Sequence, residues 1–523
     1  MKRIKESEGI DMAQWSEGYV TEIEYIADCF RDLSPTHLNL ALLHRGIAAP
    51  DTSGVFNYLE LGFGQGITLT LLAAMRPQAQ FFGNDFNPAH VLAARALADR
   101  AQLDNLHLFE DSFEELLTRD LPEMDYIVLH GIYSWISAEN RAHIVSLIRK
   151  RLKTGGVVYV SYNAQPGWAP KAPMQRAMAE FVSRHGGESL TERYRAAREF
   201  LAALDESGAG YFVHNPVAQE QLAGLWSFND AYLVHEFASQ NWVALHHADV
   251  VSDMNGAKLG FAGSTTLANN FPLYSIPPKA ATLYQSAQDP VMRELIRDFS
   301  VNTQFRRDIF VRGERRLSES ELDAGYRSLK VGLRRLVSEC DPDARLPVGD
   351  VALDPAACQP ILQALAEGSK TVEVLAALPA FAKLGPSACV DTINLLLCLK
   401  YISPVLAEAT EADSDQLAQR AQAINLALME RAFAGRYVAA LASPVIGGGI
   451  DIDRADVLFL AARQAGSDDL PRFAWAALER AGARLTCDGI PLEGEAAHLE
   501  ELRRRETVFR EARLEHYRAL GVV

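Results

Sequence analysis

The sequence contains few cysteines, and none of them form a C-x-x-C pair. A disulfide framework needs an even set of closely spaced cysteines, and a zinc ribbon needs paired C-x-x-C motifs. We therefore exclude both and interpret the thiols as reduced side chains of a cytoplasmic protein. The six cysteines among the 523 residues are Cys29, Cys340, Cys358, Cys389, Cys398 and Cys487.

Long hydrophobic runs are also absent. The most apolar stretches, residues 389–406 and 437–450, are interrupted by Asp391 and Lys400 or are too short to cross a bilayer. The charged residues at the start of the chain are not followed by the apolar run of a secretory signal. The sequence therefore predicts a cytoplasmic protein with no membrane insertion.

Basic residues are outnumbered, since 51 Lys and Arg stand against 67 Asp and Glu, a formal charge of −16. This balance repels nucleic-acid backbones at long range, so we expect no nucleic-acid partner and favour a cationic one. Residues 6–32 hold eight acidic residues and one basic residue. This segment is either a solvated arm or an interaction segment.

From about residue 55, short apolar runs alternate with helical stretches. Buried strands that alternate with helices predict a doubly wound, Rossmann-like α/β sheet of parallel strands. The apolar runs are 55–61, 80–83, 106–109, 126–129 and 157–162, and the helical stretches lie near 67–75, 88–101, 113–118 and 139–152.

A glycine-rich loop stands where the first predicted strand turns into the first helix. Gly62, Gly64 and Gly66 are spaced G-x-G-x-G, and Glu60 lies two residues before the first glycine. Glycines allow a close backbone approach to a ligand, and the following helix N-terminus offers unpaired N–H groups. The dinucleotide fingerprint G-x-G-x-x-G and the P-loop pattern both differ from this spacing.

Acidic residues follow the second and third predicted strands. Asp85 lies 19 residues past Gly66, where it can take both hydroxyls of a ribose, and Asp111 follows the third strand. Together with Glu60 they line the carboxyl edge of the sheet, where open α/β sheets bind ligands. For Asp111, with Ser112 before a helix, an N-terminal helix cap is the alternative.

Over about residues 50–170, this pattern resembles the class I S-adenosylmethionine-dependent methyltransferases. The resemblance implies S-adenosylmethionine as cofactor, with Glu60 near its methionine amino end and the loop glycines beneath it. It also implies Asp85 on the ribose and Asp111 with Ser112 at the adenine edge. The cofactor-binding residues on this basis are Glu60, Gly62, Gly64, Gly66, Asp85, Phe86, Asp111 and Ser112.

Further motifs lie along most of the chain: His130–Trp135, Ser161–Asn163 with Pro166–Trp168, Tyr232–Glu236, and Asp298-Phe299 with Gln304–Asp308. With them the sequence resembles bacterial methyltransferases that carry a methyltransferase regulatory domain, which include rickettsial lysine methyltransferases of outer-membrane proteins. The resemblance implies an enzyme that methylates lysine amines of a protein substrate. A small molecule or surface-glycan precursor is the alternative acceptor, and a cofactor-binding scaffold without activity is the third hypothesis.

The length of the chain and its candidate boundary segments predict several domains. A chain of 523 residues corresponds to roughly two to four domains of about 150 residues. A boundary lies near 205–215, and the Pro/Asp-rich stretch near 340–355 is typical of a linker. We predict an acidic N-terminal arm and helix over 1–50, a methyltransferase domain over 51–210, a helix-rich regulatory or middle domain over 211–340 and a mostly helical C-terminal domain over 341–523.

The resemblance also nominates catalytic residues, because residues after the fourth strand of this fold commonly face the transferred methyl. It implies His130 and Tyr133 there, with Tyr162 at the end of the fifth strand. A lysine acceptor must first lose its proton. His130 can take this proton, and Tyr133 and Tyr162 can orient the amine. The alternative for His130 is a hydrogen-bonded histidine that closes a strand.

Two remaining features of the sequence concern metal binding and docking. Adjacent His246 and His247 lack a spaced third ligand, so we predict no metal site. The arginine-rich region 306–335 is either a solvated helical face or a basic docking face. The sequence contains no indication of the oligomeric state.

Overall fold

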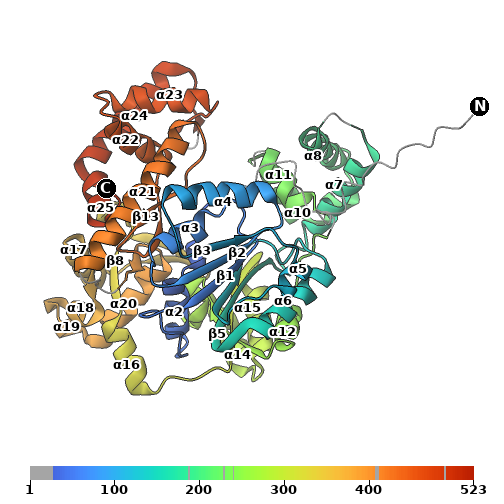
Figure 1. Ribbon diagram of the computed structural model, residues 1–523. Coiled ribbons are helices and arrows are strands. Elements are labelled where there is room, and N and C mark those ends of the chain that lie inside the picture. Colours follow the sequence, from blue (N-terminus) through green and yellow to red (C-terminus); the bar gives the residue numbers. More distant parts are fainter. Residues whose placement is uncertain (1–27, 187–188, 228–229, 240, 407–410, 488–489) are drawn as a thin grey trace, which may run out of the picture.

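A mixed seven-stranded sheet forms the centre of the computed structural model, which describes residues 28–186, 189–227, 230–239, 241–406, 411–487 and 490–523 (Figure 1). Most of the predicted acidic arm, residues 1–27, lies outside the described residues. The strand order is β3-β2-β1-β4-β5-β7-β6. The strands are β1 (Asn57–Leu61), β2 (Gln80–Asn84), β3 (Leu106–Phe109), β4 (Met124–Leu129), β5 (Leu152–Asn163), β6 (Leu259–Ser264) and β7 (Phe305–Arg312).

The first five strands are parallel and coincide with the predicted apolar runs. β7 pairs antiparallel with β5, and β6 pairs antiparallel with β7. The sheet is therefore mixed, whereas the sequence pattern predicted a sheet of parallel strands only. β6 and β7 come from the region that the sequence pattern indicated to be helix-rich. The strand β7 was not predicted because Arg306, Arg307 and Asp308 interrupt its apolar pattern.

Four helices connect the parallel strands, as the alternation predicts: α3 (Ile67–Ala74), α4 (Pro88–Arg100), α5 (Phe113–Thr118) and α6 (Ala138–Arg151). All eight residues of α3 are buried. The helix is apolar on every side because the C-terminal part of the chain covers the face that the sheet does not. α3 therefore ties the glycine-rich loop before it into the core of the protein.

A group of helices with a core of its own follows the fifth strand, including buried Trp168, Tyr194 and Phe212. In Figure 1 these green helices and the orange and red C-terminal helices lie on opposite sides of the sheet. The helices of this group are α7 (Ala172–Arg184), α8 (Leu190–Glu206), α9 (Gly210–His214), α10 (Pro216–Gly224) and α11 (Asp230–Phe237). The helices α12 (His247–Asn255), α13 (Pro272–Ser275), α14 (Ala281–Ser286) and α15 (Pro290–Val301) follow outside that core.

The C-terminal part is mostly helical and contains several small antiparallel sheets. The Pro/Asp-rich stretch predicted as a linker forms the hairpin β9–β10. The elements are α16 (Glu319–Ser328), β8 (Lys330–Leu333), β9 (Asp343–Leu346), β10 (Gly349–Ala352), α17 (Pro355–Ala366), β11 (Lys370–Thr371), α18 (Val372–Ala376), α19 (Pro379–Leu384), α20 (Pro386–Cys398), β12 (Ile402–Pro404), α21 (Glu411–Phe433), β13 (Ala440–Ser443), β14 (Gly448–Asp451), α22 (Arg454–Gln464), α23 (Leu470–Arg480), β15 (Thr486–Cys487), β16 (Ile490–Pro491), α24 (Gly494–Val508) and α25 (Leu514–Ala519).

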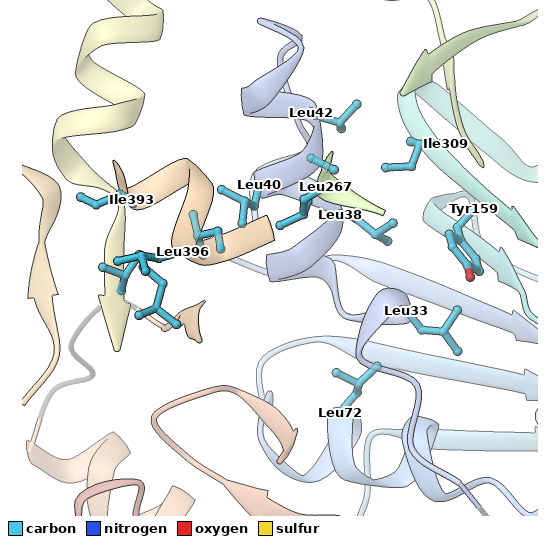
Figure 2. Close-up of a cluster of buried hydrophobic side chains, with 14 of the residues drawn as sticks. Leu33, Leu38, Leu40, Leu42, Leu72, Tyr159, Leu267, Ile309, Ile393 and Leu396 are labelled. Carbon is cyan, nitrogen blue, oxygen red and sulfur yellow. The ribbon is translucent and has the colours of Figure 1, made fainter. Parts of the chain in front are cut away.

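The helix α2 (Pro35–His44) and the short turn η1 (Arg31–Leu33) join the sheet to the C-terminal part. Figure 2 shows Leu38 and Leu40 of α2 between the sheet residue Ile309 and Leu396 of α20. The same buried cluster includes Tyr159 of β5. Burial of this apolar surface, at about 25 cal/mol per Å², holds the two parts together. Among the helices that the structure describes, none is long and apolar enough to cross a membrane.

Candidate active site

The loops that follow β1, β2, β3 and β4 meet in one pocket at the carboxyl edge of the sheet. Parallel strands end at the same edge, so residues from four separate loops converge there. An adjoining cavity shares Gly62, Gly64 and His130 with this pocket and is also lined by Glu60 and Gly66. The predicted site residues that line the pocket are Gly62, Gly64, Asp85, Phe86, Asp111, Ser112 and His130.

The glycine-rich loop needs its glycines for both conformation and space. Gly62, Gly64 and Gly66 have φ angles of +70°, +58° and +71°, a region that disfavours residues with a Cβ atom. A Cβ atom at Gly62 would lie 2.7 Å from Ile132 Cγ2, and one at Gly66 would lie 2.6 Å from Ala94 Cβ. The loop is thus pressed against its neighbours, and its backbone forms part of the pocket wall.

Asp85 is buried, with 5% exposure, and its carboxylate is held in place by three nitrogen atoms. Oδ2 accepts a hydrogen bond of 2.8 Å from the backbone N–H of Gly64. Oδ1 accepts one of 3.0 Å from the N–H of Asn87 and lies 3.1 Å from Nδ1 of His90. A carboxylate has about four acceptor positions, so one position on Oδ2 stays open to a ligand.

Glu60 is the second buried carboxyl group of the site, with 4% exposure. Its Oε2 atom has no hydrogen-bond partner among the described residues. Burial, with a further contribution from the charge of Asp85, raises the pKa of Glu60 to about 8. A buried carboxyl group that has no counter-charge in the part of the chain that the structure describes, beside a glycine-rich loop, fits a ligand that brings a cation or a strong hydrogen-bond donor.

The N-cap of α5 is Ser112 and not Asp111, for which a helix cap was the alternative, and both residues line the pocket. Ser112 Oγ accepts a hydrogen bond from the N–H of Glu115, and the Glu115 carboxylate accepts one from the N–H of Ser112. The carboxylate of Asp111 accepts two hydrogen bonds from Arg119, at 2.5 and 2.7 Å. These contacts fix the backbone at the far end of the pocket from Glu60.

His130 closes β4 and lines both the pocket and the Glu60 cavity. Its Nδ1 lies 2.8 Å from the Tyr159 hydroxyl and 3.3 Å from Ser161 Oγ. Its ring packs on Phe30, with 4.0 Å between ring centroids. Burial lowers the pKa of His130 to about 4, so the imidazole is neutral at pH 7. His130 is therefore a hydrogen-bonded histidine that closes a strand, as the alternative states, and it also lines the pocket.

The other two predicted catalytic residues are not brought to the lining of the pocket. The Tyr133 hydroxyl donates to Asp253 at 2.7 Å, and the Tyr162 hydroxyl donates to Asp308 at 2.6 Å. Both tyrosines are fully buried. Alternate residues of a strand face opposite sides of its sheet, so Ser161 faces His130 while Tyr162 faces away. The same alternation along the fifth apolar run is the pattern that points to Tyr159 and Ser161, which sequence reasoning missed.

The Tyr162 hydroxyl belongs to a buried charged network behind the sheet. Arg306 donates to Asp308, Asp298 and Glu294, at 3.0, 2.6 and 2.8 Å. Burial opposes ionisation of Asp308, yet Arg306 and His247 hold its pKa well below the usual range. A solvated helical face is therefore the wrong interpretation for Arg306, which is buried in β7. Among the described residues, no group of three His, Cys, Asp or Glu could hold a metal ion.

Replacement of Tyr162 by phenylalanine is expected to lower the free energy of unfolding by about 1.5–3 kcal/mol, because it removes a hydrogen bond to a charged acceptor. Chemical denaturation followed by far-UV circular dichroism measures this change. The matched control is Tyr437→Phe, at a side chain that is 49% exposed, where the change should stay within about 0.5 kcal/mol. Equal stability of Tyr162→Phe and the unmodified protein would contradict the assigned contact with Asp308.

Comparison with protein families gives two matches in this chain. A family described as a methyltransferase domain matches residues 59–158, and one described as a predicted methyltransferase regulatory domain matches residues 229–312. An uncharacterized protein of Synechocystis sp. is 37% identical over 97% of this chain and 99% of its own. An uncharacterized protein of Rickettsia prowazekii is 24% identical over 57% of this chain and 53% of its own.

Solved structures include one with a similar fold along nearly the whole chain. PKMT2 from Rickettsia typhi, solved in complex with AdoHcy, gives a TM-score of 0.66 at 20% identity, over 95% of this chain and 99% of its own. A second structure of PKMT2 from Rickettsia typhi gives a TM-score of 0.65. The similarity in fold includes the middle and C-terminal parts, beyond the pocket and its sheet.

Proposed function

The chain belongs to the class I S-adenosylmethionine-dependent methyltransferases that carry a methyltransferase regulatory domain, and we propose that it methylates lysine side-chain amines of a protein. The likeness in fold to PKMT2 over 95% of the chain supports a protein acceptor. A formal charge of −16, which attracts a lysine-rich surface, supports the lysine side chain. The observation that carries the proposal is a neutral histidine, His130, that lines one cavity with Glu60, whose buried Oε2 atom has no hydrogen-bond partner among the described residues.

The residues of the pocket fit S-adenosylmethionine. Oε2 of Glu60 is a buried acceptor with no partner among the described residues, as a ligand's α-ammonium group requires. Asp85 has an open acceptor position on Oδ2 for a ribose hydroxyl, and the glycine-rich loop allows close backbone approach. When bound, the cofactor supplies an electrophilic methyl group on a sulfonium. Phe86, Asp111 and Ser112 border the opposite end of the pocket, where we place the adenine.

The proposed role of His130 is to orient the acceptor amine. Lysine has an ordinary pKa of about 10.4, so roughly one amine in 2,500 is neutral at pH 7. Because the pKa of His130 is about 4, its imidazole is too weak a base to remove this proton by itself. Desolvation of the amine in the buried site lowers the amine's own pKa instead. With its proton on Nδ1 and donated to Tyr159, His130 offers Nε2 as an acceptor to the amine.

Tyr133 and Tyr162 take positioning roles in this proposal. Tyr133 ties the loop after β4 to α12 through Asp253, and Tyr162 ties β5 to the charged network of β7. Neither hydroxyl touches the pocket, so neither is assigned a step in methyl transfer. Both fix the strand ends from which His130 and Ser161 project.

Labelling of a lysate tests the proposed acceptor. The purified protein is incubated with S-adenosylmethionine that carries a radioactive methyl group and with size-fractionated lysate of its own organism, and labelled material is then digested with protease. The expected result is label in discrete, protease-sensitive bands, which are absent when the Asp85→Ala variant replaces the protein. Label confined to dialysable or protease-resistant material would contradict the proposal and assign a small-molecule or glycan acceptor.

Cofactor affinity is expected to rise by about tenfold between pH 6 and pH 7. In the free protein Glu60 keeps its proton below a pKa of about 8, whereas an α-ammonium group favours the carboxylate. Binding therefore releases a proton at pH 6, and this release decreases as the pH approaches 8. Because the folded protein holds this proton more tightly than the unfolded chain, ionisation of Glu60 costs stability as the pH rises from about 4.5 to 8.

Calorimetric titration with S-adenosylhomocysteine, in two buffers of different ionisation enthalpy, measures the released proton. Glu60→Gln should remove the proton release and the pH dependence together, and the exposed Glu123→Gln should change neither. An affinity that is independent of pH over this interval in the unmodified protein would contradict the assigned role of Glu60.

A further inference from the structure

A second cavity, of about 230 Å³, lies next to the methyltransferase pocket, on the side of the sheet that α2 covers. Phe30 lines this cavity as well as the Glu60 cavity, and its ring packs on His130. One water molecule occupies roughly 10–15 Å³ on the same measure. The cavity is therefore large enough for a small ligand, and such a ligand would lie beside Phe30, whose ring also packs on His130.

Positive charge dominates the wall of this second cavity. Five cationic side chains converge on it from separate segments of the chain, and two carboxylates, Asp32 and Asp451, oppose them. His37, also in the wall, adds no charge at pH 7 because burial and the nearby Arg31 lower its pKa to about 4. The cationic residues are Arg31, Arg307, Arg334, Arg345 and Lys400.

Two of these guanidinium groups have buried nitrogen atoms that make no hydrogen bond among the described residues. They are Nε of Arg307 and Nη1 of Arg334. Nε of Arg307 forms an ion pair of 3.4 Å with Oδ2 of Asp32 but no hydrogen bond. Arg334 uses its other terminal nitrogen to pair with Asp451. Burial and the nearby Arg334 also lower the pKa of Arg31 to about 10. Buried donors are nearly always paired in folded proteins, so the described residues leave these two donors in need of an acceptor.

We propose that this cavity binds an oxyanion, the phosphate or carboxylate group of a small ligand. Guanidinium groups present forked donors that match the two oxygens of either group. The excess of positive charge excludes the cavity as the seat of an acceptor lysine, so the ligand is distinct from the proposed methyl acceptor. The inference depends on the cavity alone and stands whether or not the chain methylates lysine.

Calorimetric titration of the full-length protein with inorganic pyrophosphate, and separately with citrate, tests this assignment at constant ionic strength. The expected result is saturable binding of at least one of them. Binding of pyrophosphate alone assigns a phosphate ligand, and binding of citrate alone assigns a carboxylate ligand. Arg307→Gln should weaken binding at least about tenfold, because it removes a charge-assisted donor. The control Arg315→Gln, at an exposed residue that pairs with Glu321 outside the cavity, should bind like the unmodified protein.

Because Arg307 lies in β7, Lys400→Gln serves as a second variant. Lys400 is exposed at the cavity wall, so its replacement leaves the buried core unchanged. Unchanged affinity for S-adenosylhomocysteine in each variant confirms that the fold is intact. The proposal is overturned if neither anion binds saturably, or if Arg307→Gln and Lys400→Gln both bind the anion as tightly as the unmodified protein. These binding results do not depend on the proposed function, so they are expected to be the same whether or not the protein methylates lysine.

Discussion

Replacement of Asp85 by alanine is expected to raise the dissociation constant of S-adenosylmethionine at least about 100-fold. The carboxylate of Asp85 accepts hydrogen bonds from the N–H groups of Gly64 and Asn87 and offers a further position to the ribose. The one bond from the ribose to this charged acceptor is worth about 1.5–3 kcal/mol, and the loss of the Gly64 bond, which loosens the loop beneath the cofactor, adds a similar cost to binding. The variant loses both the ligand contact and the fixed position of the glycine-rich loop.

The same variant is expected to change the pH dependence of cofactor binding. The charge of Asp85 adds to burial in raising the pKa of Glu60, so its removal lowers that pKa and reduces proton release on binding at pH 7. Asp120→Asn is the matched control because Asp120 is fully exposed and lies outside the pocket. A dissociation constant within about threefold of the unmodified value, below the effect of one such hydrogen bond, would contradict the assigned role of Asp85.

Replacement of His130 by alanine is expected to lower kcat about 100-fold while the affinity for S-adenosylhomocysteine changes little. The imidazole lies where Tyr159 and Ser161 fix its ring, and its loss leaves the acceptor amine without an oriented hydrogen bond. Misplacement of a reacting group by about 1 Å can cost this factor in rate. Steady-state kinetics with a labelled protein fraction, together with calorimetric titration, separates turnover from binding.

Two comparisons distinguish orientation by His130 from a structural effect. His130→Gln places an amide near the position of Nε2 and should restore part of kcat, whereas the exposed His214→Ala should leave kcat unchanged. Because the pKa of His130 is about 4, kcat should show no inflection near the ordinary imidazole pKa of about 6.5. Full turnover by His130→Ala would show that another group orients the acceptor.

The sequence alone predicts the five parallel strands and the loop that carries the proposed cofactor residues. Short apolar runs bounded by helices have few alternative folds, and the three glycines have positive φ angles that the G-x-G-x-G spacing anticipates. Glu60 and Asp85 were located because the carboxyl ends of parallel strands share one edge. Local pattern and topology together therefore predict where the pocket lies.

The features that the sequence did not predict depend on contacts between distant segments. The charged residues of β7 make it look like an exposed segment in the sequence. Arg306 is buried only because it donates hydrogen bonds to Asp298 and Glu294 of α15. The direction of the Tyr162 side chain follows from the strand pleat, which motif matching ignores. The cationic cavity unites residues from Arg31 to Lys400, and no local pattern relates them.

The identity of the methylated amino acid tests the proposed function most directly. Protein bands labelled by the enzyme with radioactive S-adenosylmethionine are hydrolysed in acid, and the amino acids are separated by chromatography beside mono-, di- and trimethyllysine. The account predicts that the label migrates with one or more of these methyllysines. Label that migrates with another methylated amino acid, or that mild base releases as methanol from an ester, would contradict a lysine acceptor.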